Sequence, residues 1–235
     1  MENNSIIKIE NLIKRFPVGK SEFTALKGIT VSFGTGEFAG LVGPSGSGKT
    51  TLLNIIGSLD APSEGEVKVL GRSVATLSHK ESAKLRNNHI GFIFQTFNLL
   101  PVYTVFENVE FALLLQKLSA SERKTKVMDA LEWVGHTDKV KSRPAMLSGG
   151  ECQRVAIARS MVKKPEIVLA DEPTANLDSK NSHNILQTMK KLNKELKTTF
   201  IFATHDEKVM QYLNRIISLE DGKIITDNFI TDAKN

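Results

Sequence analysis

The chain has 235 residues, of which 40% are hydrophobic and 24% are charged, and its mean hydropathy is −0.15. These values are typical of a soluble globular protein and exclude a disordered or collagen-like chain, while a single cysteine excludes a disulfide-stapled fold. The length allows one large domain or two small ones. No stretch approaches the roughly 18 apolar residues of a membrane span, and the N-terminus lacks the pattern of a signal peptide, so we expect a cytoplasmic protein.

The charge balance of 31 basic and 26 acidic residues gives a net charge of +5 and a pI near 9.2. Such an excess is compatible with phosphate-bearing ligands, an anionic membrane face or nucleic acid. The lysines are scattered, however, and no dense basic run is interleaved with aromatic residues. The sequence therefore indicates no nucleic-acid partner.

Apolar segments separated by glycines predict short strands in the first third of the chain. Helical patterns dominate the middle third, where Ser-x-x-Glu capping boxes open helices at Ser78 and Ser119. In the last third, continuous apolar runs alternate with helical patterns, which is typical of strands that helices cover on both faces. The expected strands span residues 6–10, 24–33, 38–42, 66–70, 90–94, 166–170, 199–203 and 215–220, and the expected helices span 51–58, 78–87, 119–135, 152–162, 179–196 and 205–212. This order indicates an α/β fold with a parallel core sheet.

A glycine-rich segment lies between the expected strand 38–42 and the expected helix 51–58. It reads Gly43-Pro44-Ser45-Gly46-Ser47-Gly48-Lys49-Thr50 and matches the pattern G-x-x-x-x-G-K-[ST]. Glycines let successive backbone N–H groups point at phosphate oxygens, and the helix N-terminus adds the positive end of its dipole. Lys49 can bind the β- and γ-phosphates, and the Thr50 hydroxyl can ligate Mg²⁺. The alternative, a glycine-rich turn with a chance lysine, leaves the flanking strand and helix unexplained, so the segment predicts a nucleoside triphosphate site.

Two carboxylates, Asp171 and Glu172, follow the buried strand 166–170. The carboxyl ends of parallel strands line the ligand crevice of such sheets, so we expect both acids to face the phosphate loop. Asp171 can hold Mg²⁺ through water, and Glu172 is placed to polarise an attacking water molecule. An ordinary acidic turn before Pro173 is the alternative, and the phosphate loop elsewhere in the chain makes it the weaker one.

A second helix start resembles an anion site. The segment Leu147-Ser148-Gly149-Gly150-Glu151 opens the expected helix 152–162, without a lysine of its own. Taken alone, Ser-Gly-Gly can be a purely structural helix cap. If it binds phosphate, it either closes on the same nucleotide or serves a nucleotide bound by another copy of the chain, and the residues leave both options open.

Together these motifs resemble the ATP-binding cassette ATPases, and in particular the subunits of lipoprotein-releasing and macrolide-exporter transporters. Further motifs of this family occur in order along nearly the whole chain: Gln95 in 94–101, Asp178 in 175–178 and His205 in 203–206. The resemblance implies a single cassette domain of the P-loop class. Its RecA-like core would comprise residues 1–95 and 164–235 with an antiparallel β flank, and its helical signature subdomain about residues 96–163.

The resemblance also implies a role for each motif residue. Glu172 would be the general base, His205 would contact the γ-phosphate, and Gln95 would contact both Mg²⁺ and the attacking water. Thr50, Gln95 and Asp171 would hold the Mg²⁺ ion. The implied assembly is a head-to-tail homodimer, or a pseudo-symmetric dimer, with two shared ATP sites. In it, Ser148, Gly149 and Gly150 would cap the γ-phosphate held by the opposite subunit, and Asp178 would lie across the interface. The residues expected to bind ATP are Phe16, which would stack on adenine, and Gly43, Pro44, Ser45, Gly46, Ser47, Gly48, Lys49, Thr50 and Thr51.

Two residues depart from the family pattern. Phe16 stands where a tyrosine is commoner, and it could instead be a core residue. Cys152 replaces a usual glutamine, and we expect it to be a small buried residue. The remaining histidines, which have polar sequence neighbours and no metal-type spacing, are expected at the surface; they are His79, His89, His136 and His183.

The apolar stretch after Gln95 could be a corner of the core. In the family this region receives a membrane permease, so we expect a permease to dock between Gln95 and Val105, with the ATPase on the cytoplasmic face of the membrane. A cell-division ATPase that regulates a membrane partner remains an alternative. Cassettes that act on DNA or ribosomes usually carry two cassettes or a long coiled-coil insertion, and a P-loop kinase would leave 147–151 unexplained.

Overall fold

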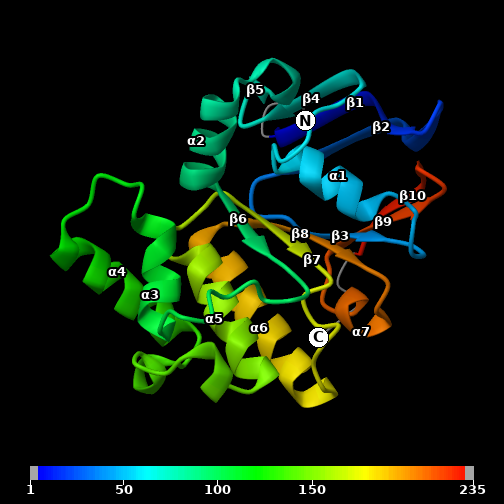
Figure 1. The fold of residues 1–235 in the computed structure, drawn as a ribbon. Helices are drawn as coiled ribbons and strands as arrows, with labels where there is room; N and C mark the ends of the chain where they lie inside the picture. The colour runs from blue at the N-terminus through cyan, green and yellow to red at the C-terminus, as the bar shows by residue number, and fades with distance from the viewer. Residues whose placement is uncertain (1–4, 231–235) are drawn as a thin grey trace. The chain divides into compact units, whose positions relative to one another are not determined.

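The computed structural model describes residues 5–230, and the contacts within it divide the chain into two compact units (Figure 1). The first unit contains the residues up to Arg86 together with those from Thr199 onward, and the second unit is Asn87–Thr198. Within the described residues, no helix combines the length and the apolar composition needed to cross a membrane.

An antiparallel sheet forms one part of the first unit. Its strand order is β2-β1-β4-β5. The strands are β1 (Ser5–Val18), β2 (Ser21–Gly34), β4 (Glu64–Val69) and β5 (Arg72–Ser73). The strand expected over 6–10 is therefore much longer than predicted, because β1 continues past a bulge at Asn11 and includes Pro17. Beyond Ile13 only β2 pairs with β1, so Pro17 lies where β1 is an edge strand and a proline is tolerated.

Parallel strands form the other part of the first unit. The strands are β3 (Phe38–Val42), β8 (Thr199–Thr204), β9 (Arg215–Glu220) and β10 (Lys223–Phe229). β3 lies between β8 and β9 and is parallel to both, and β10 pairs antiparallel with β9. β10 was not predicted, because its residues are mostly exposed and lack an apolar alternation. Asp221 and Gly222, both at positive φ, make the hairpin turn that precedes it.

The first unit has few helices. They are α1 (Lys49–Ile56), α2 (His79–His89), which extends a few residues past Arg86, and α7 (Glu207–Met210). α1 begins two residues earlier than predicted and packs its buried side chains against β8, β2 and β4. The capping box of Ser78 with Glu81 is confirmed. The helix expected over 205–212 is wrong at both ends, since α7 is only four residues long. It begins at Glu207 because Asp206 is the N-cap and accepts a hydrogen bond from the Lys208 N–H.

The second unit packs its helices around α5 (Figure 1). Its elements are β6 (Ile90–Ile93), α3 (Val105–Glu110), α4 (Ala120–Trp133), α5 (Gly149–Met161), β7 (Ile167–Asp171) and α6 (Ser179–Leu196). β6 and β7 are parallel, and α5 contacts α3, α4, α6 and β6. Because α5 is surrounded in this way, its central residues 155–158 are fully buried.

Capping boxes start three helices of this unit. The predicted box of Ser119 with Glu122 is confirmed at α4. α3 was not predicted, because its box of Thr104 with Glu107 lies in an apolar stretch that was interpreted as a core corner or a docking segment. α5 begins at Gly149 rather than at residue 152, since Ser148 also forms a complete box with the residue three positions later.

Candidate functional site

The phosphate loop connects β3 to α1, as the sequence predicts. Gly43 has φ 155° and Gly48 has φ 103°, conformations that residues with a side chain rarely adopt. A Cβ at Gly43 would collide with the Leu219 carbonyl oxygen, and one at Gly48 would lie 2.7 Å from the side chain of Leu26. The loop is therefore closely packed against other residues of its own unit and needs glycine at both positions.

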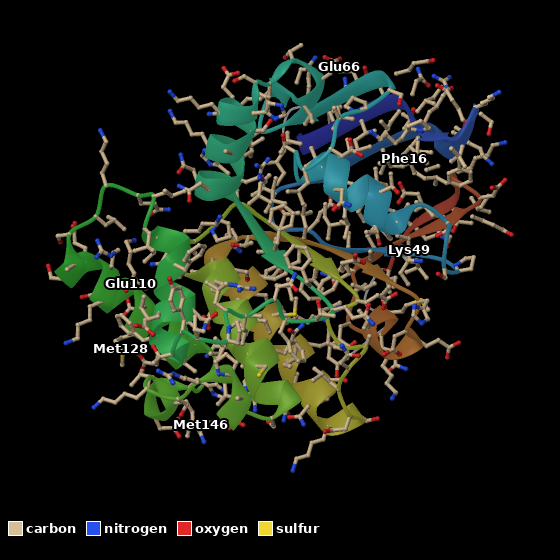
Figure 2. All side chains as sticks on the ribbon, viewed as in Figure 1. Phe16, Lys49, Glu66, Glu110, Met128 and Met146 are labelled. Atoms are coloured by element: carbon tan, nitrogen blue, oxygen red, sulfur yellow. The ribbon has the colours of Figure 1, made fainter. Side chains whose placement is uncertain are left out.

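Lys49 is 7% exposed and lies against its own loop (Figure 2). Its Nζ donates hydrogen bonds to the carbonyls of Gly43, at 2.7 Å, and Pro44, at 2.8 Å. The Ser47 carbonyl accepts a hydrogen bond from the Gly222 N–H, which ties the loop to the β9–β10 turn. The fold thus holds the ammonium group among the backbone groups that would surround a phosphate, and Thr50 and Thr51 follow it in the first turn of α1.

Phe16 lies near the end of β1, opposite Phe23 of β2 (Figure 2). Its side chain is 36% exposed, so the interpretation of Phe16 as a core residue is wrong. The Nζ of Lys14 lies 4.9 Å from the ring centroid, a cation–π contact. Stacking of Phe16 on adenine stays a prediction, and this half-exposed ring is suited to it.

We expect Phe16→Ala to weaken ATP and GTP binding alike by roughly 5- to 150-fold, because stacking on a base is worth about 1–3 kcal/mol and tolerates any base. Phe16→Tyr should be nearly neutral. Titration calorimetry with both nucleotides measures the effect, and Phe23→Ala, which removes the exposed ring opposite, is the matched control. Equal losses in the two alanine variants would contradict a specific role for Phe16.

The two acids lie at the end of β7. Asp171 is its last residue, and Glu172 follows with φ 44°, in the left-handed region. A non-glycine residue held there costs about 1–3 kcal/mol and persists only where its surroundings fix it. The Glu172 carbonyl accepts a hydrogen bond from the Ala175 N–H, which closes the turn that follows. The surroundings of Glu172 therefore fix its backbone, and its catalytic role stays a prediction.

The loop after Gln95 is tied to two other segments of the second unit. The Gln95 carbonyl accepts a hydrogen bond from Asn176 Nδ2 at 2.9 Å. The next residues, Phe97 and Asn98, are in the left-handed region, and both of their carbonyls accept hydrogen bonds from the Arg159 guanidinium, at 2.7 and 2.5 Å. The fold therefore connects the loop of Gln95 to the segment before α6 and to the C-terminal half of α5.

Ser148 is the N-cap of α5. Its hydroxyl accepts a hydrogen bond from the Glu151 N–H, and the Glu151 carboxylate accepts one from the Ser148 N–H at 2.8 Å. The hydrogen bonds from Ser148 lower the pKa of Glu151 to about 2, so this carboxylate is charged at neutral pH. The capping interpretation is confirmed, and Gly149 and Gly150 form the first turn of the helix.

Gly150 sets how closely α5 approaches α6. A Cβ at this position would lie 2.7 Å from Asn181 Oδ1, so a larger residue would displace the Asn181 side chain. Asp178 caps α6 by accepting hydrogen bonds from the Asn181 N–H and Nδ2, which lower the pKa of its carboxyl group. The second unit thus brings together the segments of Gln95, Ser148 and Asp178.

His205 belongs to the first unit, where it follows the last residue of β8. Its side chain is exposed, and the next residue, Asp206, caps α7. The candidate residues therefore divide between the units: Phe16, the phosphate loop and His205 lie in the first, and Gln95, Ser148, Asp171, Glu172 and Asp178 lie in the second.

The surface prediction for the remaining histidines is wrong for His136, which is only 4% exposed. The N–H groups of Gly135 and His136 donate to the carbonyls of Glu132 and Leu131, which makes a Schellman motif at the end of α4. The residue after the left-handed glycine folds back on the helix in this motif, so His136 is buried. Cys152 is buried as expected, and burial raises the pKa of its thiol.

Sequence reasoning assigned no role to Asn176 or Arg159, which hold the loop of Gln95. Arg159 could have been singled out from the sequence, because it is a charged residue that follows the apolar run 155–158 of α5. A polar side chain in that position needs hydrogen-bond partners. Its partners could not be identified from the sequence, since they lie about 60 residues earlier in the chain.

Comparison with known proteins decides the family. Residues 26–175 match the family model described as ABC transporter, and this range contains the phosphate loop, Gln95, Ser148 and both acids. The chain belongs to the ABC transporter family. It is therefore an ATP-binding cassette that hydrolyses ATP, as the sequence motifs predicted.

Relatives of this cassette cover nearly all of its length. The lipoprotein-releasing system ATP-binding protein LolD of Pseudoalteromonas translucida is 44% identical over 222 residues, which are 94% of this chain and 96% of LolD. The macrolide export ATP-binding/permease protein MacB of Bartonella quintana is 41% identical over 98% of this chain and 35% of that longer protein.

A solved structure shows the same fold. The ATP-binding cassette MJ0796, from Methanocaldococcus jannaschii, has been solved as a dimer in a post-hydrolysis state with ADP and Pi. It matches this cassette with a TM-score of 0.88 and 41% identity, over 96% of this chain and 99% of that one. The predicted α/β fold of a P-loop cassette with an antiparallel β flank is confirmed.

Proposed function

We propose that two copies of this cassette bind two ATP molecules between them, and that closing and opening of this dimer drives a membrane permease of the lipoprotein-releasing or export type. One observation carries the proposal: the chain has two helix starts suited to phosphate, and only α1 carries a lysine. A head-to-tail dimer gives the second, at Ser148, a phosphate to bind. The dimeric, nucleotide-bound relative supports this arrangement.

In the proposed reaction, water attacks the γ-phosphorus of ATP while the bond to the bridging oxygen of ADP breaks. Lys49 and the loop N–H groups bind the β- and γ-phosphates. Glu172 accepts a proton from the attacking water, which Gln95 helps to orient. His205 and the partner subunit's Ser148 stabilise the charge that develops on the γ-phosphate oxygens.

Mg²⁺ is the cofactor that this chemistry implies. Thr50, Gln95 and Asp171 offer a hydroxyl, an amide oxygen and a carboxylate, which are the hard oxygen donors that Mg²⁺ prefers. Thr50 lies in the first turn of α1 with an exposed side chain, and Asp171 ends β7, so both groups lie at the ends of rigid elements. The donor set fits Mg²⁺, which supplies neutralisation of the charge on the β- and γ-phosphate oxygens when bound.

We assign phosphate binding and chemistry to the RecA-like core, residues 1–95 and 164–235, and recognition of the partner's nucleotide to the helical subdomain at about residues 96–163. The permease would dock between Gln95 and Val105. Val102 and Tyr103 support this choice, because they expose apolar side chains, Val102 to 70%, beside the loop that Arg159 anchors. The cassette would then lie on the cytoplasmic face of the membrane.

Co-purification tests the docking proposal. We expect Val102→Asp to abolish co-purification with the integral-membrane permease, because a carboxylate in an apolar interface must be desolvated. ATP hydrolysis by the isolated variant should stay at the wild-type rate. Ile225→Asp, at an apolar position of similar exposure on β10, is the matched control and should keep the partner. Retention of the permease by Val102→Asp would contradict docking at this segment.

A further inference from the structure

Gln153 is a fully buried amide on α5, the helix that begins at Ser148. Its Nε2 donates a hydrogen bond to the Pro173 carbonyl at 2.5 Å. Its Oε1 is buried and has no hydrogen-bond partner among the residues that the structure describes. An unsatisfied buried acceptor is destabilising, so the amide is favoured at this position only through the hydrogen bond that it donates to the Pro173 carbonyl. The role of Gln153 therefore lies in holding that carbonyl.

The partner of this amide directly follows Glu172. Proline has no N–H, so its carbonyl is the one backbone hydrogen-bonding group of residue 173, and Gln153 holds it. Glu172 itself has the left-handed backbone described above, which requires restraint from its surroundings. The held carbonyl belongs to the peptide between Pro173 and Thr174, and the proline ring fixes φ of Pro173. Gln153 therefore restrains the residue that directly follows Glu172, and with it the turn from which the Glu172 side chain extends.

Gln153 also lies close to the start of α5, where Ser148 is the N-cap. It lies five positions after Ser148, and helix bonds join the two positions rigidly. In the proposed dimer, Glu172 acts on the ATP of its own chain, whereas Ser148 caps the ATP of the partner. The Gln153 side chain thus connects two sites. It joins α5, whose start contacts the partner's ATP, to the turn after Glu172, which acts on the ATP of its own chain.

We propose that Gln153 is a positioning residue for Glu172. Its side chain links the geometry of the base to the position of α5. The inference rests on the proposed role of Glu172 as the general base. Loss of the amide should slow the chemical step and leave ATP binding intact, because Gln153 acts only through the turn at residues 172–173. It should also reduce cooperativity between the two sites, since movement of α5 would no longer be passed to the turn.

Gln153→Met tests the proposal with a side chain of similar length that cannot donate a hydrogen bond. We expect kcat to fall on the order of tenfold to a hundredfold, as for a misplaced catalytic group. The affinity for ATP should stay within about twofold, and the Hill coefficient for ATP should fall toward one. Ser160→Ala is the matched control, because Ser160 is buried on the same helix and donates only to the Ile157 carbonyl within it. A kcat for Gln153→Met equal to that of Ser160→Ala would overturn the proposal.

Gln153→Glu supplies a readout that a purely structural role would not change. A buried glutamic acid can donate to the Pro173 carbonyl only when protonated, and burial favours its protonated form. We expect kcat relative to wild type to rise from pH 8 to pH 6, at an equal folded fraction measured by circular dichroism. A constant ratio would overturn the proposal, as would the failure of both Gln153 variants to fold.

Glu172→Gln separates this inference from the proposed function. If Glu172→Gln hydrolyses ATP at the wild-type rate, Glu172 is not the general base, and the positioning role of Gln153 is contradicted as well. If Glu172→Gln is inactive while Gln153→Met has normal kcat and cooperativity, the base stands and only the positioning role of Gln153 is lost.

Discussion

Glu172→Gln should reduce ATP hydrolysis on the order of a hundredfold to ten-thousandfold, the usual contribution of a general base, while ATP still binds. The substitution keeps the shape of the side chain and one acceptor oxygen, and it replaces the basic carboxylate with an amide. A steady-state phosphate-release assay measures the rate. Glu166→Gln is the control, because Glu166 lies just before β7 at its opposite end and pairs with His89.

The same variant tests the shared site. If Ser148, Gly149 and Gly150 cap the partner's γ-phosphate, unhydrolysed ATP should hold two chains together, because the ligand binds the dimer in preference to the monomer. We expect light scattering to show Glu172→Gln as a dimer with ATP and as a monomer with ADP. Adding Ser148→Arg should prevent the dimer by placing a bulky side chain at the helix end.

Two outcomes would contradict this mechanism. A monomer of Glu172→Gln at saturating ATP would not support a site shared between isolated cassettes. Hydrolysis at the wild-type rate would show that Glu172 is not the base.

Lys49→Ala should weaken ATP affinity by at least about a hundredfold, because charge-assisted hydrogen bonds to the β- and γ-phosphates are lost. Equilibrium binding of a fluorescent ATP analogue measures this effect. Since Lys49 also bonds the carbonyls of Gly43 and Pro44, a thermal unfolding scan should accompany it.

Lys27→Ala is the control for Lys49→Ala. Lys27 lies in the same unit and pairs with Asp221, in the β9–β10 turn that contacts the phosphate loop. Its removal should leave ATP affinity unchanged. Wild-type ATP affinity in a folded Lys49→Ala variant would refute the assignment of the phosphate loop.

The elements predicted well from the sequence are those whose burial follows a local pattern. β3 and α6 have the predicted bounds, because continuous burial and a regular helical stripe are both visible in the chain. β10 and the second half of β1 were missed because neighbouring strands and turns, rather than their own side chains, determine them. His136 was misplaced because the Schellman motif buries it whatever the polarity of its sequence neighbours.

The residues of the candidate site also differ in whether a local sequence pattern indicates them. Motifs with fixed spacing predict Lys49, Glu172 and Ser148 as site residues, because a phosphate loop needs glycines and a lysine at set positions and the family motifs place the other two. The hydrogen bonds of Gln153, Asn176 and Arg159 join segments that lie 20 to 81 residues apart, so no local pattern indicates them. Polar residues inside a buried helix could have indicated that such bonds exist, but not what they bind.

The rigidity of α5 has a thermodynamic consequence. Its 13 residues make a rod about 20 Å long, with Ser148 at one end and Arg159, which holds the loop after Gln95, near the other. If a permease contacts that loop and a phosphate contacts Ser148, both ligands act on one body, and their binding equilibria form a closed cycle. The factor by which the permease changes ATP affinity must then equal the factor by which ATP changes permease affinity. A transport substrate that changes the affinity of the permease for this loop would, by this cycle, change the ATP affinity of the cassette. It would thereby change the ATP concentration at which the two cassettes dimerise.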